Sequence, residues 1–127
     1  MNTKQVIVIR KDLKMRRGKE IAQGAHASMA VLTKFMTKNK RGWFGFYPPK
    51  AMEDWLDGSF RKIVVYVESE IELIAIYTKA AARGIPCALI KDNGATEFHG
   101  EKTVTCCAIG PDIDERIDEI TGELTLY

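Results

Sequence analysis

The sequence predicts an α/β fold: a single three-layer domain with a mixed, mostly parallel four-stranded sheet and helices on both faces. Short β-branched, apolar runs alternate with helix-like segments, which is the pattern of parallel β–α–β units. The length of 127 residues suits one domain, taken as residues 1–127. An apolar fraction of 46% and a charged fraction of 28% are those of globular proteins, and they exclude a disordered chain or a coiled coil.

The first half of the chain predicts a strand, two helices and an irregular connection. The run QVIVIR (5–10) predicts a buried strand, and a helix follows from Gly18 to about Met36. One side of that helix carries residues at three- and four-residue spacing and is its expected packing face: Ile21, Ala25, Ser28, Leu32 and Met36. Two Gly and two Pro within 39–49 predict an irregular break, and a short helix at about 49–56 follows, since Pro suits a first helical turn.

The second half predicts three strands and two helices. The strands are expected at residues 62–67, 87–91 and 103–110. A capping box of Ser69 and Glu72 opens a helix that runs to Arg83, and Asp112 opens a last helix that ends before Gly122. Only about eleven residues without a helical pattern separate the last two strands, so the fourth strand is expected to be antiparallel to a neighbour.

Two loops are expected at one edge of this sheet. Sites in such folds form beyond the carboxyl ends of the parallel strands, where loops 11–19 and 92–102 would meet. Charge is uneven along the chain: residues 1–62 hold 14 Lys and Arg against 5 Asp and Glu, and residues 63–127 hold 5 against 12. Six basic residues lie within 10–19, which predicts a face for an anionic partner, although a solvated basic loop has the same composition.

The numbers of cysteines and histidines predict the cellular compartment and whether the chain can form a zinc site. Three cysteines at positions 87, 106 and 107, without a C-x-x-C spacing, predict reduced, packed thiols and a cytoplasmic protein. With two histidines, no all-protein zinc site is expected. No apolar run approaches the roughly 18 residues of a membrane span, and a strand beginning by Gln5 leaves no room for a signal peptide.

Polar side chains in the two loops are the candidate site. Lys19, Gln23 and His26 lie within roughly 60° of each other on a helix, away from the expected apolar face. A lysine in the first turn of a helix favours phosphate binding, whereas a helix histidine is equally well a core residue. Asp92 closes a buried strand, where an acid, a base or an orienting carboxylate often lies, but the following Asn93-Gly94 also fits a turn cap.

Aromatic and basic residues are interleaved in W-F-G-F-Y (43–47) and its neighbours Lys38, Lys40 and Arg41. This combination can stack unpaired bases while holding their phosphates. Packing over the sheet edge or a dimer contact is the commoner use of such aromatics, and a homodimer is therefore possible.

The segment DLKMRRGKEIAQGAHAS (12–28) resembles the signature of the type 2 peptidyl-tRNA hydrolases of archaea and eukaryotes. The resemblance continues through D-x-G-x-T (92–96), G-x-K-T-V (100–104), A-I-G-P (108–111) and the tail TGELTLY (121–127), and it covers nearly the whole chain, with 37–60 the least alike. It implies hydrolysis of the ester between a peptide and the 3′ ribose of tRNA, by water and without metal or cofactor. It also implies a polar cluster around a cleft: Lys19, Gln23, His26, Asp92, Thr96 and Thr103.

Within that cluster we expect Asp92 to orient or deprotonate the water, directly or through Thr96, and Lys19 to donate to the oxyanion. His26 is expected to lie deeper, one turn beyond Gln23. The predicted RNA contacts are Lys14, Arg16, Arg17, Lys38, Lys40 and Arg41. The second loop departs from the family pattern, with Ala95 for an arginine and Glu97 for a glutamine, so a non-hydrolytic RNA-binding or regulatory relative, or a hydrolase of another acyl ester, is the alternative.

Overall fold

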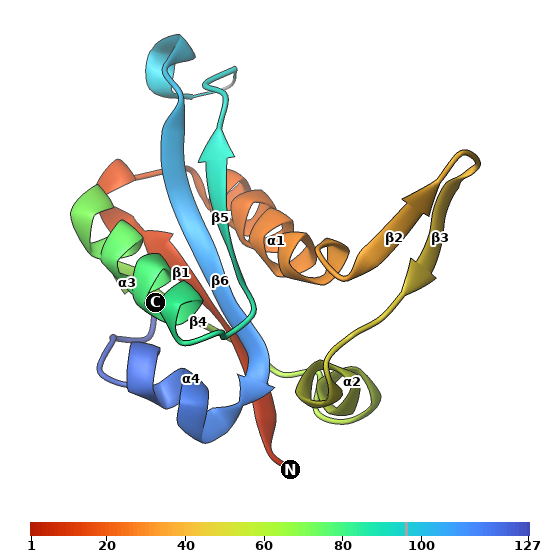
Figure 1. The fold of residues 1–127 in the computed structure, drawn as a ribbon. Coiled ribbons are helices and arrows are strands. Elements are labelled where there is room, and N and C mark those ends of the chain that lie inside the picture. Colours follow the sequence, from red (N-terminus) through yellow and green to blue (C-terminus); the bar gives the residue numbers. More distant parts are fainter. Residues whose placement is uncertain (96) are drawn as a thin grey trace.

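A four-stranded mixed sheet lies at the centre of the computed structural model, which describes residues 1–95 and 97–127 (Figure 1). Its strand order is β4-β1-β6-β5, from β1 (Thr3–Arg10), β4 (Lys62–Val67), β5 (Cys87–Asp92) and β6 (Thr103–Ile113). β1 pairs with β4 in parallel, and β6 is antiparallel to both β1 and β5. Three strands therefore run one way and β6 runs the other. The predicted α/β class and the antiparallel fourth strand are confirmed.

Helices cover both faces of the sheet. α1 (Arg17–Thr33) and α2 (Lys50–Asp57) pack on one face, and α3 (Glu70–Ala82) and α4 (Asp114–Thr121) pack on the other. Successive residues of β1 point to opposite faces, so Val6 and Val8 join the core under α3 and α4 while Ile7 and Ile9 join the core under α1 and α2. A buried strand must be apolar on both sides, which is why β1 is an unbroken apolar run.

The predicted irregular break at 39–49 is wrong in its first part. Residues there form an antiparallel hairpin of β2 (Met36–Asn39) and β3 (Gly42–Phe46), a separate two-stranded sheet that projects beyond the end of α1 (Figure 1). Gly42 has a φ of +118°, and the Asn39 side chain accepts a hydrogen bond from the Arg41 amide at 2.8 Å. Gly42, taken as a loop signal, and Asn39 are thus the residues that close a tight hairpin turn.

The packing face of α1 agrees with the predicted one only at Ser28 and Leu32, which are buried. The helix packs through Gly24, Ala27, Ser28, Val31 and Leu32, whereas Ile21 is 67% exposed and Ala25 is exposed. The reason is the position of α1, which lies over β6, β5 and β1. Ile21 and Ala25 therefore lie on the side of the helix nearest to β4, where they line a pocket instead of the core. Met36, expected on the same face, lies beyond the helix in β2.

The last helix also begins later than predicted, because β6 continues to Ile113 and α4 starts at Asp114. Asp112 does not cap the helix; its carboxylate accepts hydrogen bonds from the Ile113 amide and from Arg116 Nε. The Ser69 cap of α3 is confirmed, with its hydroxyl accepting from the Glu72 amide at 3.2 Å.

The three cysteines are free and buried, and burial raises the pKa of Cys106 to about 11. No helix in residues 1–95 and 97–127 is long and apolar enough to cross a membrane.

Candidate active site

The two predicted loops meet at one edge of the sheet, as expected. Lys19 lies in the first turn of α1, just after the loop that follows β1, and Asp92 is the last residue of β5. Their side chains form an ion pair, with Lys19 Nζ 2.7 Å from Asp92 Oδ1. The side chains are only 15% and 9% exposed, so the pair is poorly screened by solvent. A link between residues 73 positions apart fixes the start of α1 against the end of β5.

The Asp92 carboxylate is held on both oxygens. Oδ1 also accepts a long hydrogen bond from Gln23 Nε2 at 3.4 Å, and Oδ2 accepts from the Gly94 amide at 2.9 Å. The hydrogen bond from Lys19 lowers the pKa of Asp92; burial opposes this, and the Gly94 amide and the nearby charges of Lys19 and His26 add to the lowering. Asp92 is therefore a carboxylate at neutral pH, held by its partners in one orientation.

Gln23 is buried and is oriented from β6, which the sequence did not reveal. Thr105 Oγ1 donates to Gln23 Oε1 at 2.5 Å, and Cys106 Sγ donates to the Gln23 carbonyl oxygen at 3.3 Å. Two adjacent residues can face the same helix because of a β-bulge: Ile90 pairs with Cys106 and Lys91 pairs with Val104, leaving Thr105 as an extra residue. Strict alternation would point Thr105 and Cys106 to opposite faces, so no sequence signal marks Thr105.

Three further residues of the predicted cluster remain to be placed: His26, Thr103 and Thr96. His26 is exposed on the helix surface, so the expectation that it lies deeper is wrong; its charge interaction with Asp92 adds to the lowering of the Asp92 pKa. Thr103 is half-buried and pairs with Asp92 across β5 and β6, and its hydroxyl donates to the Glu101 carbonyl oxygen at 3.2 Å. Thr96 lies outside the described residues.

A hollow of about 600 Å³ adjoins the Lys19–Asp92 pair. It is lined from both loops, which carry the short 3₁₀ helices η1 (Lys11–Leu13) and η2 (Phe98–Gly100); the lining residues include Lys14, Arg16, Gly94, Ala95 and Glu97. Gly94 connects the hollow with the ion pair, because its amide holds Asp92 while the residue itself lines the hollow. Its φ is +82°, and an added Cβ would lie 2.6 Å from the Glu101 carbonyl oxygen. Glycine is therefore required there.

The six predicted RNA-binding residues fall into two groups. Lys14 and Arg16 line the hollow just before α1, and Arg16 is 90% exposed with Nε 3.9 Å from Glu97 Oε1. Arg17, the first residue of α1, lines a pocket on the other side of the helix together with Glu20 and Tyr127. Lys38, Lys40 and Arg41 lie in the β2–β3 hairpin, at the opposite end of α1. α1 has 17 residues, so the two groups are separated by about 25 Å along the helix at 1.5 Å per residue. The fold thus brings Lys14 and Arg16 to the candidate site and places the hairpin residues far from it.

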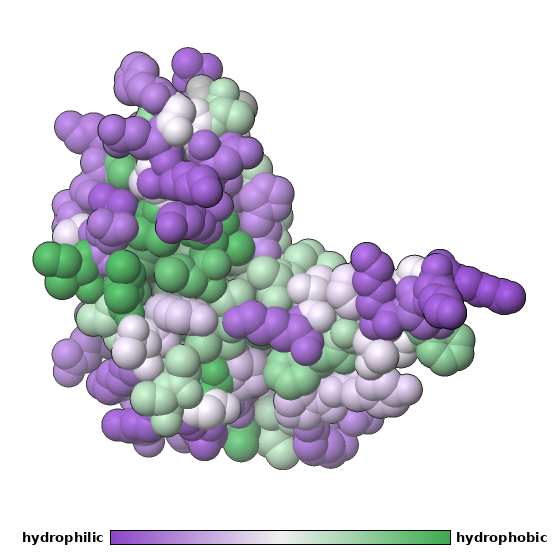
Figure 2. All heavy atoms as spheres, turned by 45° about the horizontal axis from the view of Figure 1, so that its top comes forward, coloured by the Kyte–Doolittle hydropathy of each residue, from purple (hydrophilic) through white to green (hydrophobic). Residues whose placement is uncertain are grey.

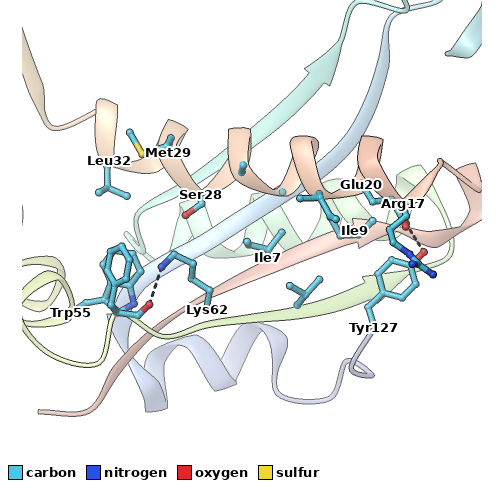
Figure 3. Close-up of a pocket in the computed structure, with 15 residues that line it drawn as sticks. Ile7, Ile9, Arg17, Glu20, Ser28, Met29, Leu32, Trp55, Lys62 and Tyr127 are labelled. Carbon is cyan, nitrogen blue, oxygen red and sulfur yellow. Dashed lines mark hydrogen bonds between the residues drawn. The ribbon is translucent and has the colours of Figure 1, made fainter. Parts of the chain in front are cut away.

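An apolar groove of about 630 Å³ lies on the other side of α1 (Figure 3). Ile7 and Ile9 of β1 form its floor, and Met29 and Leu32 of α1 form one wall (Figure 3). Tyr127 lies at one end, where its hydroxyl donates to the Glu20 carboxylate and this contact raises the pKa of Tyr127 to about 12. The groove is lined mainly by apolar side chains; its polar lining residues are Arg17, Glu20, Ser28, Lys62 and Tyr127, of which Ser28 is buried.

Within residues 1–95 and 97–127 no group of three or more His, Cys, Asp or Glu side chains is placed to hold a metal ion. The site consists of the Lys19–Asp92 ion pair, the oriented amide side chain of Gln23 and the Gly94 N–H that donates to Asp92. Such groups can hold a water molecule and donate to a developing oxyanion.

The family model described as peptidyl-tRNA hydrolase PTH2 matches residues 3–127. The chain belongs to this peptidyl-tRNA hydrolase family. A relative named peptidyl-tRNA hydrolase from Methanocaldococcus jannaschii is 46% identical over 123 residues, covering 97% of this chain and 98% of the relative. Another with the same name, from Haloquadratum walsbyi, is 43% identical and covers 98% and 99%.

A solved structure described as a protein of unknown function from Agrobacterium tumefaciens strain C58 matches with a TM-score of 0.60. It covers 100% of this chain and 98% of that chain at 13% identity, which supports the fold alone. The family match, in contrast, spans both loops of the candidate site, so the ion pair belongs to a region that the peptidyl-tRNA hydrolase family model matches.

Proposed function

We propose that this chain is a peptidyl-tRNA hydrolase, which cleaves the ester between a peptide and the 3′ ribose of tRNA by attack of water. The observation that carries the proposal is the Lys19–Asp92 ion pair beside a hollow with basic residues on its rim, in a chain that belongs to this family. The divergent, non-hydrolytic alternative is not favoured, because the curated relatives of similar length carry the name of the enzyme.

In the proposed reaction Asp92 orients the attacking water. Its carboxylate accepts three hydrogen bonds within the described part of the chain, and a carboxylate has about four lone-pair sites, so a water can donate to it as well. Because its pKa is lowered, Asp92 is a weak base. Its contribution is orientation and charge, and proton acceptance follows only as the water becomes acidic in the transition state. Thr96 is the proposed relay for that proton where Asp92 does not accept it directly.

Lys19 is the proposed donor to the oxyanion that forms on the ester carbonyl. Asp92 holds its ammonium at the edge of the sheet, and both side chains are largely buried, which strengthens the interaction with a developing charge. Gln23 is a positioning residue: Thr105 holds its carbonyl oxygen, so its NH₂ group points to Asp92.

The phosphates of the tRNA are proposed to bind at the start of α1. Lys14, Arg16 and Arg17 are exposed there, and the first amides of a helix of 17 residues add a positive dipole. The loss of an arginine at Ala95 and the gain of Glu97 reduce positive charge across the hollow, and Arg16 lies close enough to Glu97 to offset it. A tRNA substrate and reduced, buried thiols are consistent with action in the cytoplasm.

A homodimer is proposed to form across the apolar groove. Ile21, Ala25 and Met29 form an exposed stripe on α1 at four-residue spacing, and Ala25 is the small residue at its centre. A two-fold axis at Ala25 would place Ile21 of one copy on Met29 of the other. Light scattering should give twice the chain mass, and Ile21→Glu should return it to one chain mass. A wild-type mass of one chain would refute the dimer.

The test of the proposed function is release of deacylated tRNA from N-acetyl-aminoacyl-tRNA by the purified protein. Asp92→Asn is the test variant. Asp118→Asn is the matched control, since Asp118 also pairs with a lysine, Lys4, at 2.6 Å, but on α4 away from the hollow. We expect turnover in the wild type and the control and a large loss in Asp92→Asn. Binding of tRNA with no release at high enzyme concentration would instead support the non-hydrolytic alternative.

A further inference from the structure

The β2–β3 hairpin presents aromatic rings to solvent. Trp43 is 61% exposed, Phe44 is 78% exposed and Tyr47, which follows the hairpin, is 70% exposed. The hairpin stands away from the body of the molecule as an arm whose tip is hydrophilic (Figures 1 and 2). Scattered exposed apolar residues are ordinary, but adjacent rings on a projecting element mark a contact surface.

The charge around these rings is of one sign. No Asp or Glu occurs between Glu20 and Glu53, whereas Lys38, Lys40 and Arg41 are exposed on the hairpin. Lys38 is the cross-strand partner of Trp43, and its Nζ lies 6.0 Å from the centre of the indole ring. Flat rings next to cations fit a ligand with both planar bases and phosphates.

The rings are held by the backbone of the hairpin. Tyr47 donates its amide hydrogen to the Phe35 carbonyl oxygen at 2.9 Å, which ties the end of β3 to the end of α1. Gly45 makes room for the Tyr47 ring, because a Cβ at Gly45 would lie 2.8 Å from that ring. A two-stranded scaffold with fixed ends orders the rings before binding, which lowers the entropy cost of stacking.

We propose that this arm, residues 36–47, is a second RNA contact that stacks unpaired bases, with Lys38, Lys40 and Arg41 holding the adjoining phosphates. The identity of that RNA as tRNA rests on the proposed function. Its 3′ end is single-stranded, so nucleotides leading away from an ester at Lys19 and Asp92 can follow α1 over the roughly 20 Å from Lys19 to the end of the helix, beyond which the arm begins. An apolar partner or a membrane would not use the rings as planes and would not distinguish unpaired from paired RNA.

Tryptophan fluorescence tests the proposal directly, because the chain has two tryptophans in different settings. Trp43 is 61% exposed, whereas Trp55 is 1% exposed and donates to the Arg61 carbonyl oxygen. We expect saturable quenching with a single-stranded RNA ending in CCA and weak quenching with an RNA duplex of equal charge. Trp43→Phe should remove the signal while retaining binding. Equal quenching by both RNAs, or a response to anionic vesicles instead of RNA, would overturn the proposal.

Kinetics separate this proposal from the hydrolase activity itself. Phe44→Ala should raise KM for N-acetyl-aminoacyl-tRNA about tenfold through loss of stacking, with kcat unchanged. Hydrolysis of N-acetyl-aminoacyl-adenosine, which lacks the rest of the RNA, should not change. Ile71→Ala is the matched control, since Ile71 is 83% exposed on α3. An unchanged KM in Phe44→Ala would overturn the arm's role. If no substrate is hydrolysed, the proposed function fails, and the fluorescence titration still decides whether the arm stacks bases.

Discussion

Replacing Asp92 by Asn removes one negative charge from the site while keeping the size of the side chain. The carboxylate accepts hydrogen bonds from Lys19 and Gln23 on one oxygen and from the Gly94 amide on the other. An Asn side chain has a single carbonyl oxygen, so its NH₂ group must face either Lys19 or the Gly94 amide, and one donor then meets another donor. The substitution therefore costs an unmet hydrogen bond as well as the charge of the ion pair.

The expected magnitudes follow from burial. Leaving a buried donor unmet costs about 1–3 kcal/mol. Breaking a fully buried ion pair costs about 3–5 kcal/mol, and here the two side chains keep 15% and 9% exposure, which favours the lower end. These costs overlap, so we expect the free energy of unfolding to fall by about 3 kcal/mol. Turnover of N-acetyl-aminoacyl-tRNA should fall about 100-fold or more, because water is no longer oriented by a charge, while tRNA affinity stays near normal.

Urea unfolding and single-turnover hydrolysis measure the two effects separately. The pKa of Asp92 is lowered in the folded state, so its contribution to stability is complete above its ordinary value of 3.8 and is lost as pH falls through the lower folded value. The difference in unfolding free energy between wild type and Asp92→Asn should thus be constant above about pH 5 and shrink below about pH 4. Full turnover in Asp92→Asn would refute the catalytic role and leave the carboxylate as a turn cap.

Three other substitutions test the surroundings of this pair. Arg16 and Arg17 replaced together by Ala should weaken tRNA binding and reduce the slope of log affinity against log salt by about two; an unchanged slope places the phosphates elsewhere. Thr105→Val removes the hydrogen bond that holds Gln23. We expect kcat to fall about tenfold with KM little changed, because a misaligned group in an active site lowers the rate by about one to two orders of magnitude. An unchanged kcat would mean that Gln23 needs no orientation. Gly94→Ala should distort the second loop, because its Cβ would lie 2.6 Å from a backbone carbonyl oxygen, and should lower both the unfolding temperature and turnover; wild-type values of both would contradict the steric argument.

Local sequence signals were sufficient for most elements of the fold. β4 was predicted at its observed bounds, and the Ser69 cap places α3 correctly, because a buried strand and a helix cap depend on neighbouring residues alone. The meeting of Lys19 and Asp92 was also predictable, since β1 and β5 run in the same direction and their carboxyl ends share one edge. The family motifs in both loops indicate the same edge.

Where the sequence misled, the deciding forces act between distant residues. Apolar periodicity in α1 cannot tell which face meets the sheet, because Ile21 and Val31 are equally apolar; only the position of α1 over β6 and β5 buries Val31 and exposes Ile21. Glycines in residues 39–49 signal a turn, but whether the flanking residues pair as a hairpin depends on register across the turn. Both outcomes depend on contacts that a local pattern does not contain.

The composition and motifs of this chain determine a basic first half, a family and the residues available for catalysis. Tertiary structure decides how those residues are held. The bulge at Thr105 turns a strand residue toward Gln23, and Gln23 in turn reaches Asp92 from a neighbouring helix. A bulge shifts the pairing of two strands by one residue, and its free energy depends on the packing on both sides of the sheet. That packing exists only once α1, β5 and β6 are assembled, so the orientation of the site is a property of the fold.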